Sequence, residues 1–307
     1  MGEYTTQELI SIFAMQGFAG FSLFSVLLLM ALGLAIIFGQ MGVINMAHGE
    51  FMAVGAYTTY LMSAVSEKYF PGFIQYYFVF AIIASFFIAG FLGYLAELAL
   101  IRHLYKRPLD TLLATWGLSL IMQQSFRSIF GAREVSPTLP EWLLGSYQPT
   151  ETIDIPLNGL FVLVLTFVVT LGVFILMYRS SWGLRVRATT QNRVMSGAVG
   201  INTNKVDRLT FALGCGIAGI AGAAFTTIAS TGPTIGSLYI VDTFMVVVFG
   251  GAGSLFGTIA SAFSIAQAQS ILEFFISGSM AKVITLLTIV VFLMLRPEGL
   301  FASKVRK

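Results

Sequence analysis

The residues whose chemistry stands out are three polar side chains between two long apolar runs. Asn45, His48 and Glu50 occur in the stretch GVINMAHGEF. Asn45 suits the N-cap of a helix that starts near Ala47, and Glu50 in the first turn would gain from the helix dipole. An ionisable group inside a membrane is, however, also a candidate for a functional site. Capping and a place on a permeation path both remain open, although His48 and Glu50 are expected on different helix faces.

A second polar pattern lies in the stretch DTLLATWGLSLIMQQ. Thr115, Ser119 and Gln123 are spaced four residues apart, so they share one face of a helix. Trp116 and Gln124 flank this face. Two hydroxyls and a carboxamide on one face suit a neutral, hydrogen-bonding solute. The alternative is that these groups bond neighbouring membrane helices to each other.

Sequence signatures of enzymes and metal sites are incomplete in this chain. His48 and Glu50 match the His-x-Glu of zinc deaminases, but that signature also needs a cysteine pair and the chain contains one cysteine. With only two histidines, no zinc site is predicted. The stretch GCGIAG spells a dinucleotide fingerprint, but it falls inside an apolar run, where small residues serve close helix packing. We therefore expect a protein that is not an enzyme and binds neither cofactor nor metal itself.

The composition predicts the elements that hold these residues. The chain is 57% hydrophobic and 10% charged, far from the roughly 25% charged average of soluble domains, so an integral membrane protein is expected. A bilayer core needs about 20 apolar residues per helix. Helix-length runs without strict alternation predict an all-α, polytopic membrane protein with about eight to nine transmembrane helices in a single domain, 1–307. The runs are 12–38, 48–66, 77–101, 111–130, 157–178, 209–230, 254–276 and 281–295.

The distribution of basic residues predicts the orientation in the membrane. Most of the 17 Lys and Arg residues lie in 102–110, in 179–208 and in the C-terminal tail, which the positive-inside rule places in the cytoplasm. Residues 131–156 are acidic and rich in proline, so they are expected to form the main outer loop. An outside N-terminus and a cytoplasmic C-terminus require an odd number of crossings. The short apolar run 243–249 would belong to the ninth helix.

Glycines interrupt the apolar runs at two places with similar sequences. LAIIFGQMG at 34–42 is weakly echoed by VVVFGGAGSLFG at 246–257, and a new helix is predicted after each. Paired broken or re-entrant helices in two halves of a chain point to a transporter binding region, and the echo predicts a weak two-half repeat. The alternative is that the glycines only allow close helix packing. The glycines assigned to the breaks are Gly39, Gly42, Gly49, Gly250, Gly251 and Gly253.

The long basic loop 179–208 is the segment expected to contact a partner. Val194, Ala198 and Ile201 recur at helical spacing, which predicts a short amphipathic helix. Such a helix would dock into a soluble subunit or lie on anionic lipid. The arginines around it are Arg185, Arg187 and Arg193.

Three motifs together resemble a known family. GVINMAHGEFMAVGAY, GLRVRATTQNRVMSGAVGIN and FGGAGSLFGT resemble the LivH-type permeases of ABC importers for branched-chain amino acids and related solutes, and the resemblance covers nearly the whole chain. Within that family, RPLDTLLATWGLSLIMQQ and RSIFGAREV are similar to the permeases of urea importers, the UrtB type.

The resemblance implies one subunit of an assembly in the bacterial inner membrane. Its partners would be a second permease of the LivM or UrtC type, two ATP-binding subunits that hold ATP and Mg, a periplasmic solute-binding protein and the lipid bilayer. No nucleic-acid partner is expected. Loop 179–208 would contact the ATPase.

The expected function is import of urea or a short amide by ATP-driven alternating access. Import of a branched-chain amino acid and an ATP-independent urea channel are the alternatives. A proton-coupled carrier that uses Glu50 as its relay belongs to a third class.

Overall fold

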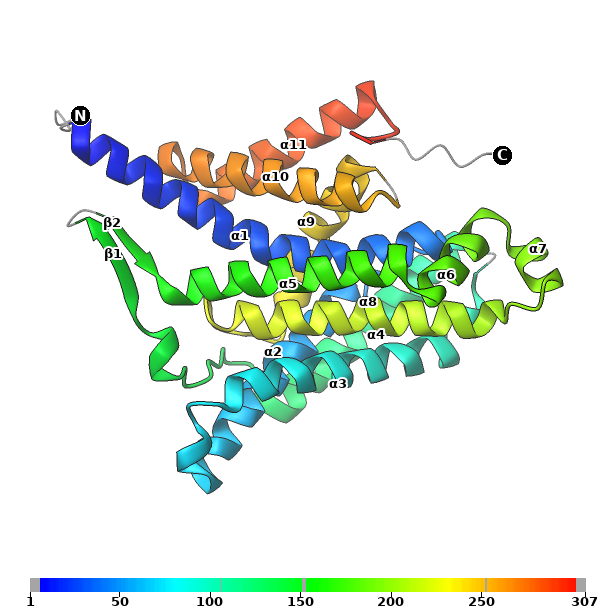
Figure 1. Cartoon of the computed structure of the whole chain (residues 1–307), viewed down its shortest axis with the longest axis horizontal. Coiled ribbons are helices and arrows are strands. Elements are labelled where there is room, and N and C mark those ends of the chain that lie inside the picture. The colour runs from blue at the N-terminus through cyan, green and yellow to red at the C-terminus, as the bar shows by residue number, and fades with distance from the viewer. Residues whose placement is uncertain (1–5, 106, 151–152, 252, 302–307) are drawn as a thin grey trace.

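Helices make up almost the whole structure. The computed structural model describes residues 6–105, 107–150, 153–251 and 253–301. Two short helices, α6 (Ser181–Gln191) and α7 (Arg193–Ala198), extend from one end of the bundle (Figure 1). The predicted all-α, polytopic fold is confirmed. The long helices are α1 (Thr6–Met41), α2 (His48–Tyr69), α3 (Tyr77–Ala99), α4 (Pro108–Phe130), α5 (Leu157–Arg179), α8 (Thr203–Phe225), α9 (Ile235–Gly250), α10 (Leu255–Phe275) and α11 (Gly278–Leu295).

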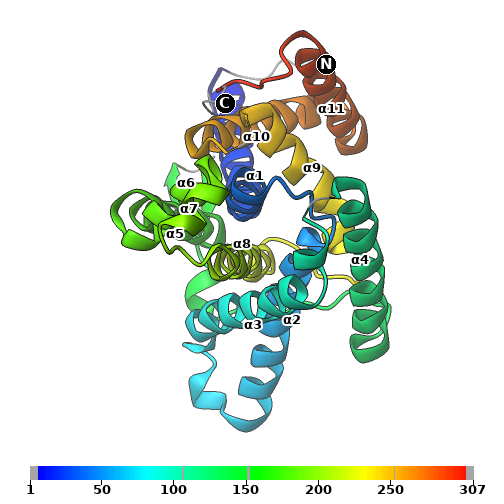
Figure 2. The same cartoon turned by 90° about the vertical axis from the view of Figure 1, so that its right-hand side faces the viewer.

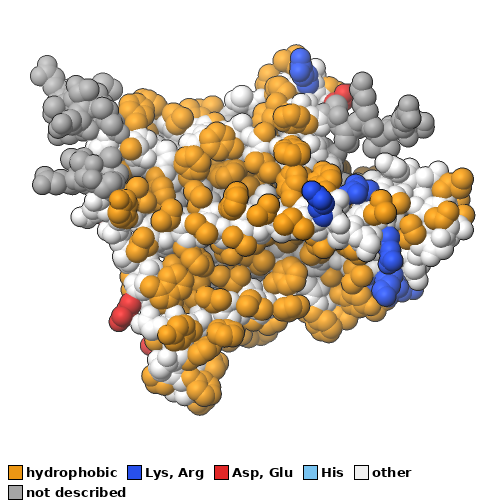
Figure 3. Space-filling model, in the orientation of Figure 1, with side chains coloured by type: hydrophobic (Ala, Val, Ile, Leu, Met, Phe, Trp, Pro, Cys, Tyr) orange, Lys and Arg blue, Asp and Glu red, His pale blue; other side chains and the backbone are white. Residues whose placement is uncertain are grey.

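Six helices in the described part of the chain are long and apolar enough to cross a membrane, namely α1, α3, α5, α8, α10 and α11. Helix α9 is apolar but has only 16 residues. Helices α2 and α4 are long enough, but polar residues such as Glu50 and Gln123 lower their hydropathy. The prediction of eight or nine crossings therefore stays a prediction. Figure 3 shows the broad hydrophobic surface of the bundle, with Lys and Arg side chains gathered mainly toward one side.

The predicted outer loop, 131–156, contains a β-hairpin that the sequence did not indicate. Strand β1 (Ser146–Thr150) pairs antiparallel with β2 (Ile153–Pro156). Val135 and Thr231 exchange two backbone hydrogen bonds, which fixes this loop to the segment before α9.

The two ends of the bundle are different in character. The hairpin lies at the end opposite to α6 and α7 (Figure 1). We call these the hairpin end and the basic end, the latter holding α6, α7 and the 3-10 turn η2 (Ile101–His103). Two further 3-10 turns, η1 (Pro71–Phe73) and η3 (Glu141–Leu143), lie in the connections before α3 and before β1. The segments predicted to be cytoplasmic thus share one end, as the charge pattern requires.

Helices α1 to α4 and α8 to α11 form two inverted repeats. Helix α1 runs from the hairpin end to the basic end, α8 runs the opposite way, and each is followed by a non-helical segment and a shorter inner helix (Figures 1 and 2). Helix α3 packs along α8, and α10 packs along α1 in the equivalent place. Likewise, α4 contacts α2 and α11 contacts α9. The predicted two-half repeat is therefore present.

The register of this repeat differs from the predicted one. The break at 42–47 after α1 corresponds to 226–234 after α8, and not to 246–257. Gly251 and Gly253 instead lie in the connection between α9 and α10, with φ of 95° and 84°. The similarity of the two Phe-Gly sequences indicated the wrong register, because glycine is as suitable for a tight connection between two helices as for a helix break.

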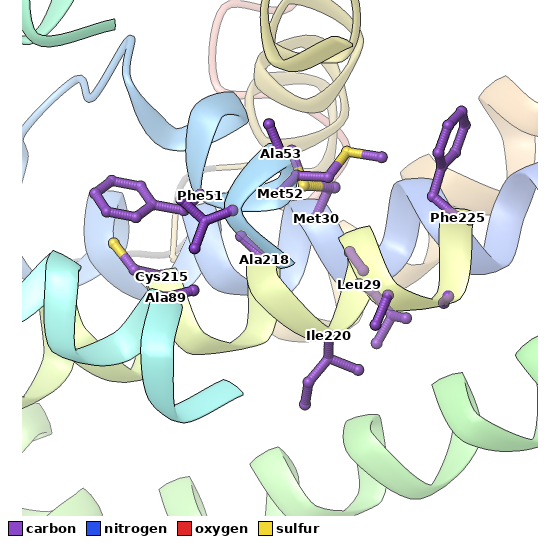
Figure 4. Packing of buried hydrophobic residues seen from close by; sticks show 14 of the residues in the cluster. Leu29, Met30, Phe51, Met52, Ala53, Ala89, Cys215, Ala218, Ile220 and Phe225 are labelled. Carbon is purple, nitrogen blue, oxygen red and sulfur yellow. The ribbon is translucent and has the colours of Figure 1, made fainter. Parts of the chain in front are cut away.

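Helix α8 lies at the centre, and its glycines let neighbouring helices approach closely. A Cβ on Gly55 of α2 would lie 1.9 Å from the carbonyl oxygen of Gly219, and one on Gly33 of α1 would lie 2.4 Å from that of Gly214. Cys215 is fully buried in the same packed cluster (Figure 4). The GCGIAG stretch therefore serves helix packing.

Candidate translocation site

The break after α1 is a non-helical segment in which Val43, Asn45 and Ala47 are buried. Gly42 has φ 64°, and helix α2 does not start until His48. Within the break, the Met46 amide donates to Thr115 Oγ1 of α4 at 3.1 Å. The Ala47 amide donates to Asn45 Oδ1 at 3.1 Å. Asn45 was predicted to cap α2, but the N-cap is Ala47, without a side-chain hydrogen bond, and Asn45 stabilises the preceding turn instead.

His48 shows that α2 starts deep inside the molecule. Its Nε2 lies 3.2 Å from the carbonyl oxygen of Met30, and its side chain is fully buried. Met30 precedes the end of α1 at Met41 by 11 residues, a helical length of about 16 Å. His48 thus points toward α1, while Glu50 points toward α4, as expected for different faces of one helix.

Helix α9 starts against the start of α2. A Cβ on Gly49 would lie 2.1 Å from the carbonyl oxygen of Gly236, and one on Gly236 would lie 2.7 Å from Cδ of Glu50. Both residues are second in their helices, so the two helix N-termini meet. Helix α2 then runs to the hairpin end and α9 to the basic end (Figure 1). Only glycine at both positions allows this approach.

Glu50 is the centre of the polar cluster. Its side chain is 1% exposed, and its Oε1 accepts hydrogen bonds from Ser119 Oγ and Gln123 Nε2, both at 2.9 Å. Gln123 Nε2 also lies 3.1 Å from Ser119 Oγ and 3.3 Å from Ser237 Oγ of α9. The spacing of Thr115, Ser119 and Gln123 correctly predicted one polar face. It did not reveal that this face binds a carboxylate.

Trp116 and Gln124 do not join this cluster. Trp116 is 53% exposed, and Gln124 is also exposed on the outer side of α4. They were predicted along the translocation path as flanks of the polar face. The structure does not bring either side chain to Glu50.

The predicted break glycines lie in four different places. Gly42 lies in the break itself, and Gly49 lies inside α2 at the contact with α9. Gly39 packs inside α1, where a Cβ would lie 2.7 Å from Cα of Gly253. The remaining ones, Gly250, Gly251 and Gly253, lie at the α9–α10 connection on the basic end.

Sequence reasoning missed two polar residues near the site. Ser237 is the third residue of α9, as Glu50 is the third residue of α2. This equivalence can be recognised only when the repeat is aligned in the correct register. Asp242 lies within α9 and forms an ion pair with Lys282 of α11 at 2.7 Å. Each inner helix is thus bound to its outer neighbour through a carboxylate, α2 to α4 by Glu50 and α9 to α11 by Asp242.

The amphipathic helix predicted in the long basic loop ends before Ile201. Helix α7 starts after Asn192, whose Oδ1 accepts from the Met195 amide, and it ends at Ala198. Ile201 therefore lies beyond the helix, and Val194 is 82% exposed. The prediction of one helix through both residues was wrong because α7 ends at Ala198, and Gly200, with φ of 90°, breaks the helical backbone before Ile201.

The arginines of this loop have different surroundings. Arg187 donates to the carbonyl oxygen of Met177, and Arg193 pairs with Asp207 at the start of α8. Both therefore hold the loop to the bundle. Arg185 is exposed and free to face a partner.

A polar cavity opens at the basic end. Its volume is about 820 Å³, and its lining includes Gln40, Arg102, Arg107 and Arg193. Tyr105, also in the lining, donates a hydrogen bond to Glu97 at 2.5 Å. Burial, together with this bond, raises the pKa of Tyr105, which keeps the phenol protonated as a donor.

Two inverted membrane repeats whose inner helices meet at a buried carboxylate define a class of protein, the transporters. Among the described residues, there is no group of three or more His, Cys, Asp or Glu side chains that could hold a metal ion. The chain belongs to the family described as "Branched-chain amino acid transport system / permease component", which matches residues 17–293. It is thus a multi-pass membrane permease and not an enzyme.

Several curated permeases are similar over nearly their full length. The high-affinity branched-chain amino acid transport system permease protein LivH of Salmonella typhimurium is 26% identical, over 94% of this chain and 95% of its own. The permease BraD of Pseudomonas aeruginosa is 26% identical, over 92% and 93%. A probable LivH of Methanocaldococcus jannaschii is 26% identical, over 90% and 88%. No solved structure matches the chain.

Proposed function

We propose that this chain is the membrane-spanning permease subunit of an ATP-driven importer for a branched-chain amino acid or a similar small amino acid. The observation that carries the proposal is the buried Glu50 carboxylate between the starts of α2 and α9. A charged group at this depth is costly in a membrane protein unless it has a function or a partner. The names of the relatives support an amino-acid solute.

Urea is the second candidate solute. The face formed by Thr115, Ser119 and Gln123 favours it, since hydroxyls and a carboxamide suit a neutral amide. In the structure, however, Ser119 and Gln123 are engaged with Glu50, and Thr115 accepts from the Met46 amide. These contacts leave fewer groups for a neutral solute, so we place the amino acid first.

In the proposed mechanism, the two inner helices alternately open the Glu50 site toward each end of the bundle. ATP-binding subunits in the cytoplasm would drive the change by binding one arrangement more tightly than the other, because a ligand with equal affinity for both shifts nothing. A solute-binding protein would deliver the solute from outside, and a second permease would complete the membrane part. The bacterial inner membrane is the proposed location, with the basic end in the cytoplasm.

Uptake by membrane vesicles tests the proposal. Vesicles carrying this chain with its partner subunits and loaded binding protein should accumulate labelled leucine only when ATP is supplied, and should not accumulate labelled urea. ATP-dependent accumulation of urea without leucine would reverse the order of the two solutes. Flux of urea without ATP would identify a channel, and leucine uptake abolished by an uncoupler while ATP is maintained would identify a proton-coupled carrier.

A further inference from the structure

One oxygen of the central carboxylate has no partner in the described part of the chain. Glu50 Oε1 accepts two hydrogen bonds, but Oε2 is buried and accepts none. A buried carboxylate oxygen without a donor is costly, and such a group calls for a ligand or another explanation. The donors on Ser119 and Gln123 are directed at Oε1 instead.

The basic side chains that pair with buried carboxylates are engaged elsewhere in the described part of the chain. Lys282 pairs with Asp242, Arg193 with Asp207, and Arg208 with Glu97, in each case away from the start of α2. The missing donor for Glu50 is therefore not supplied by these side chains.

The two helix starts place partial positive charge beside Glu50. Helix N-termini carry partial positive charge, and Glu50 lies in the first turn of α2 and against Gly236 in the first turn of α9. Together with the bonds from Ser119 and Gln123, these dipoles offset part of the cost of burying a carboxylate. A carboxylate with one free oxygen is suited to a cationic group that carries several donors and supplies the missing charge.

We propose that Glu50 Oε2 binds the α-ammonium group of the transported solute. An ammonium group has three donors and a full positive charge, which fits one free carboxylate oxygen better than a neutral amide does. The rim of the site is accessible, because Ser237 is exposed and Gln123 is only partly buried. The inference rests on the proposed function and specifies which part of an amino acid the site recognises.

Direct binding to the assembled, solubilised importer tests this inference. Labelled leucine is bound in the absence of the solute-binding protein, and two fragments compete: 3-methylbutylamine, which keeps the amine, and 4-methylpentanoate, which keeps the carboxylate. In the wild type, the amine should compete and the acid should not. Glu50→Gln should weaken leucine binding by roughly 30-fold or more, as for loss of one partner of a buried charge pair, and should abolish competition by the amine.

Matched controls separate recognition from folding. Glu273→Gln removes an exposed carboxylate from α10 and should leave leucine binding unchanged. Equal competition by the two fragments in the wild type would overturn the inference without any variant, as would unchanged binding by Glu50→Gln. Absence of leucine binding in the wild type, with binding of labelled urea in its place, would overturn the proposed amino-acid function itself.

Discussion

At the scale of residues, the chemistry of the site comes from glycines as much as from polar groups. Glu50 reaches the start of α9 only because Gly49 and Gly236 allow two backbones to touch. The sequence indicated Asn45, His48 and Glu50 as candidate residues of the site, but it also indicated Asn45 as the N-cap of a helix. Helical spacing also predicted the polar face of α4. What spacing cannot reveal is the partner across a tertiary contact, so the link between that face and Glu50 needed the structure.

A methyl group at the contact between α2 and α9 should separate the two helix starts. Gly49→Ala would place Cβ 2.1 Å from the Gly236 carbonyl oxygen, so backbone must move. We expect a loss of about 1–3 kcal/mol in stability, typical of overpacking, and a marked loss of leucine uptake. Thermal unfolding of the purified complex and vesicle uptake measure the two effects.

Gly172→Ala is the matched control for this substitution. Gly172 lies within α5, and a Cβ there would meet nothing within 4 Å. Its stability and uptake should equal those of the wild type. Equal behaviour of the two alanine variants would contradict the close contact of α2 with α9.

At the scale of elements, the basic loop illustrates what a periodic pattern can miss. Apolar residues at helical spacing predicted one helix through Val194 and Ile201, whereas α7 ends at Ala198 and Gly200, with φ of 90°, precedes Ile201. The result is a short helix with exposed apolar side chains, Val194 and Met195 among them. We propose this surface of α7, with the exposed Arg185, as the contact with an ATP-binding subunit.

A charge on α7 should uncouple the permease from its energy source. Val194→Asp puts a carboxylate on the 82% exposed position without disturbing packing inside the chain. ATP-dependent uptake should fall at least tenfold while the protein still inserts into the membrane, because a buried charge at the interface opposes docking. Uptake in vesicles and co-purification of the ATP-binding subunits are the measurements.

Ser181→Asp provides the same charge at the exposed start of α6. An acidic residue is tolerated at a helix start, so uptake should remain near the wild-type value. Normal uptake and normal co-purification by Val194→Asp would show that α7 is not the docking surface.

At the scale of the whole molecule, composition predicted the helical membrane fold, and the three quoted motifs predicted the permease family. Apolar runs located most long helices because a bilayer imposes one length and one polarity on every crossing. The basic segments indeed gather at one end. A two-half repeat was expected, but its predicted register was wrong, since LAIIFGQMG and VVVFGGAGSLFG have similar glycines in different structural roles. Segment 226–234, the structural counterpart of 42–47, has no evident sequence similarity to it.

Labelling from one side of the membrane should distinguish the two ends of the bundle. The native Cys215 is buried, so single introduced cysteines report without background from it. Ser146→Cys on β1 should react with a membrane-impermeant maleimide added to intact cells, whereas Ser181→Cys on α6 should react only after the membrane is opened. The reverse pattern would contradict a cytoplasmic basic end.

Helix α5 belongs to neither repeat, but the inverted arrangement depends on it. The first four-helix unit finishes at the same end at which it began, so a second unit joined directly to it would have the same orientation. The one additional crossing by α5 brings the chain to the opposite end of the bundle, so that the second unit starts there and is inverted. A protein without that single helix would bring both inner helices in from the same side, and Gly49 and Gly236 would no longer meet.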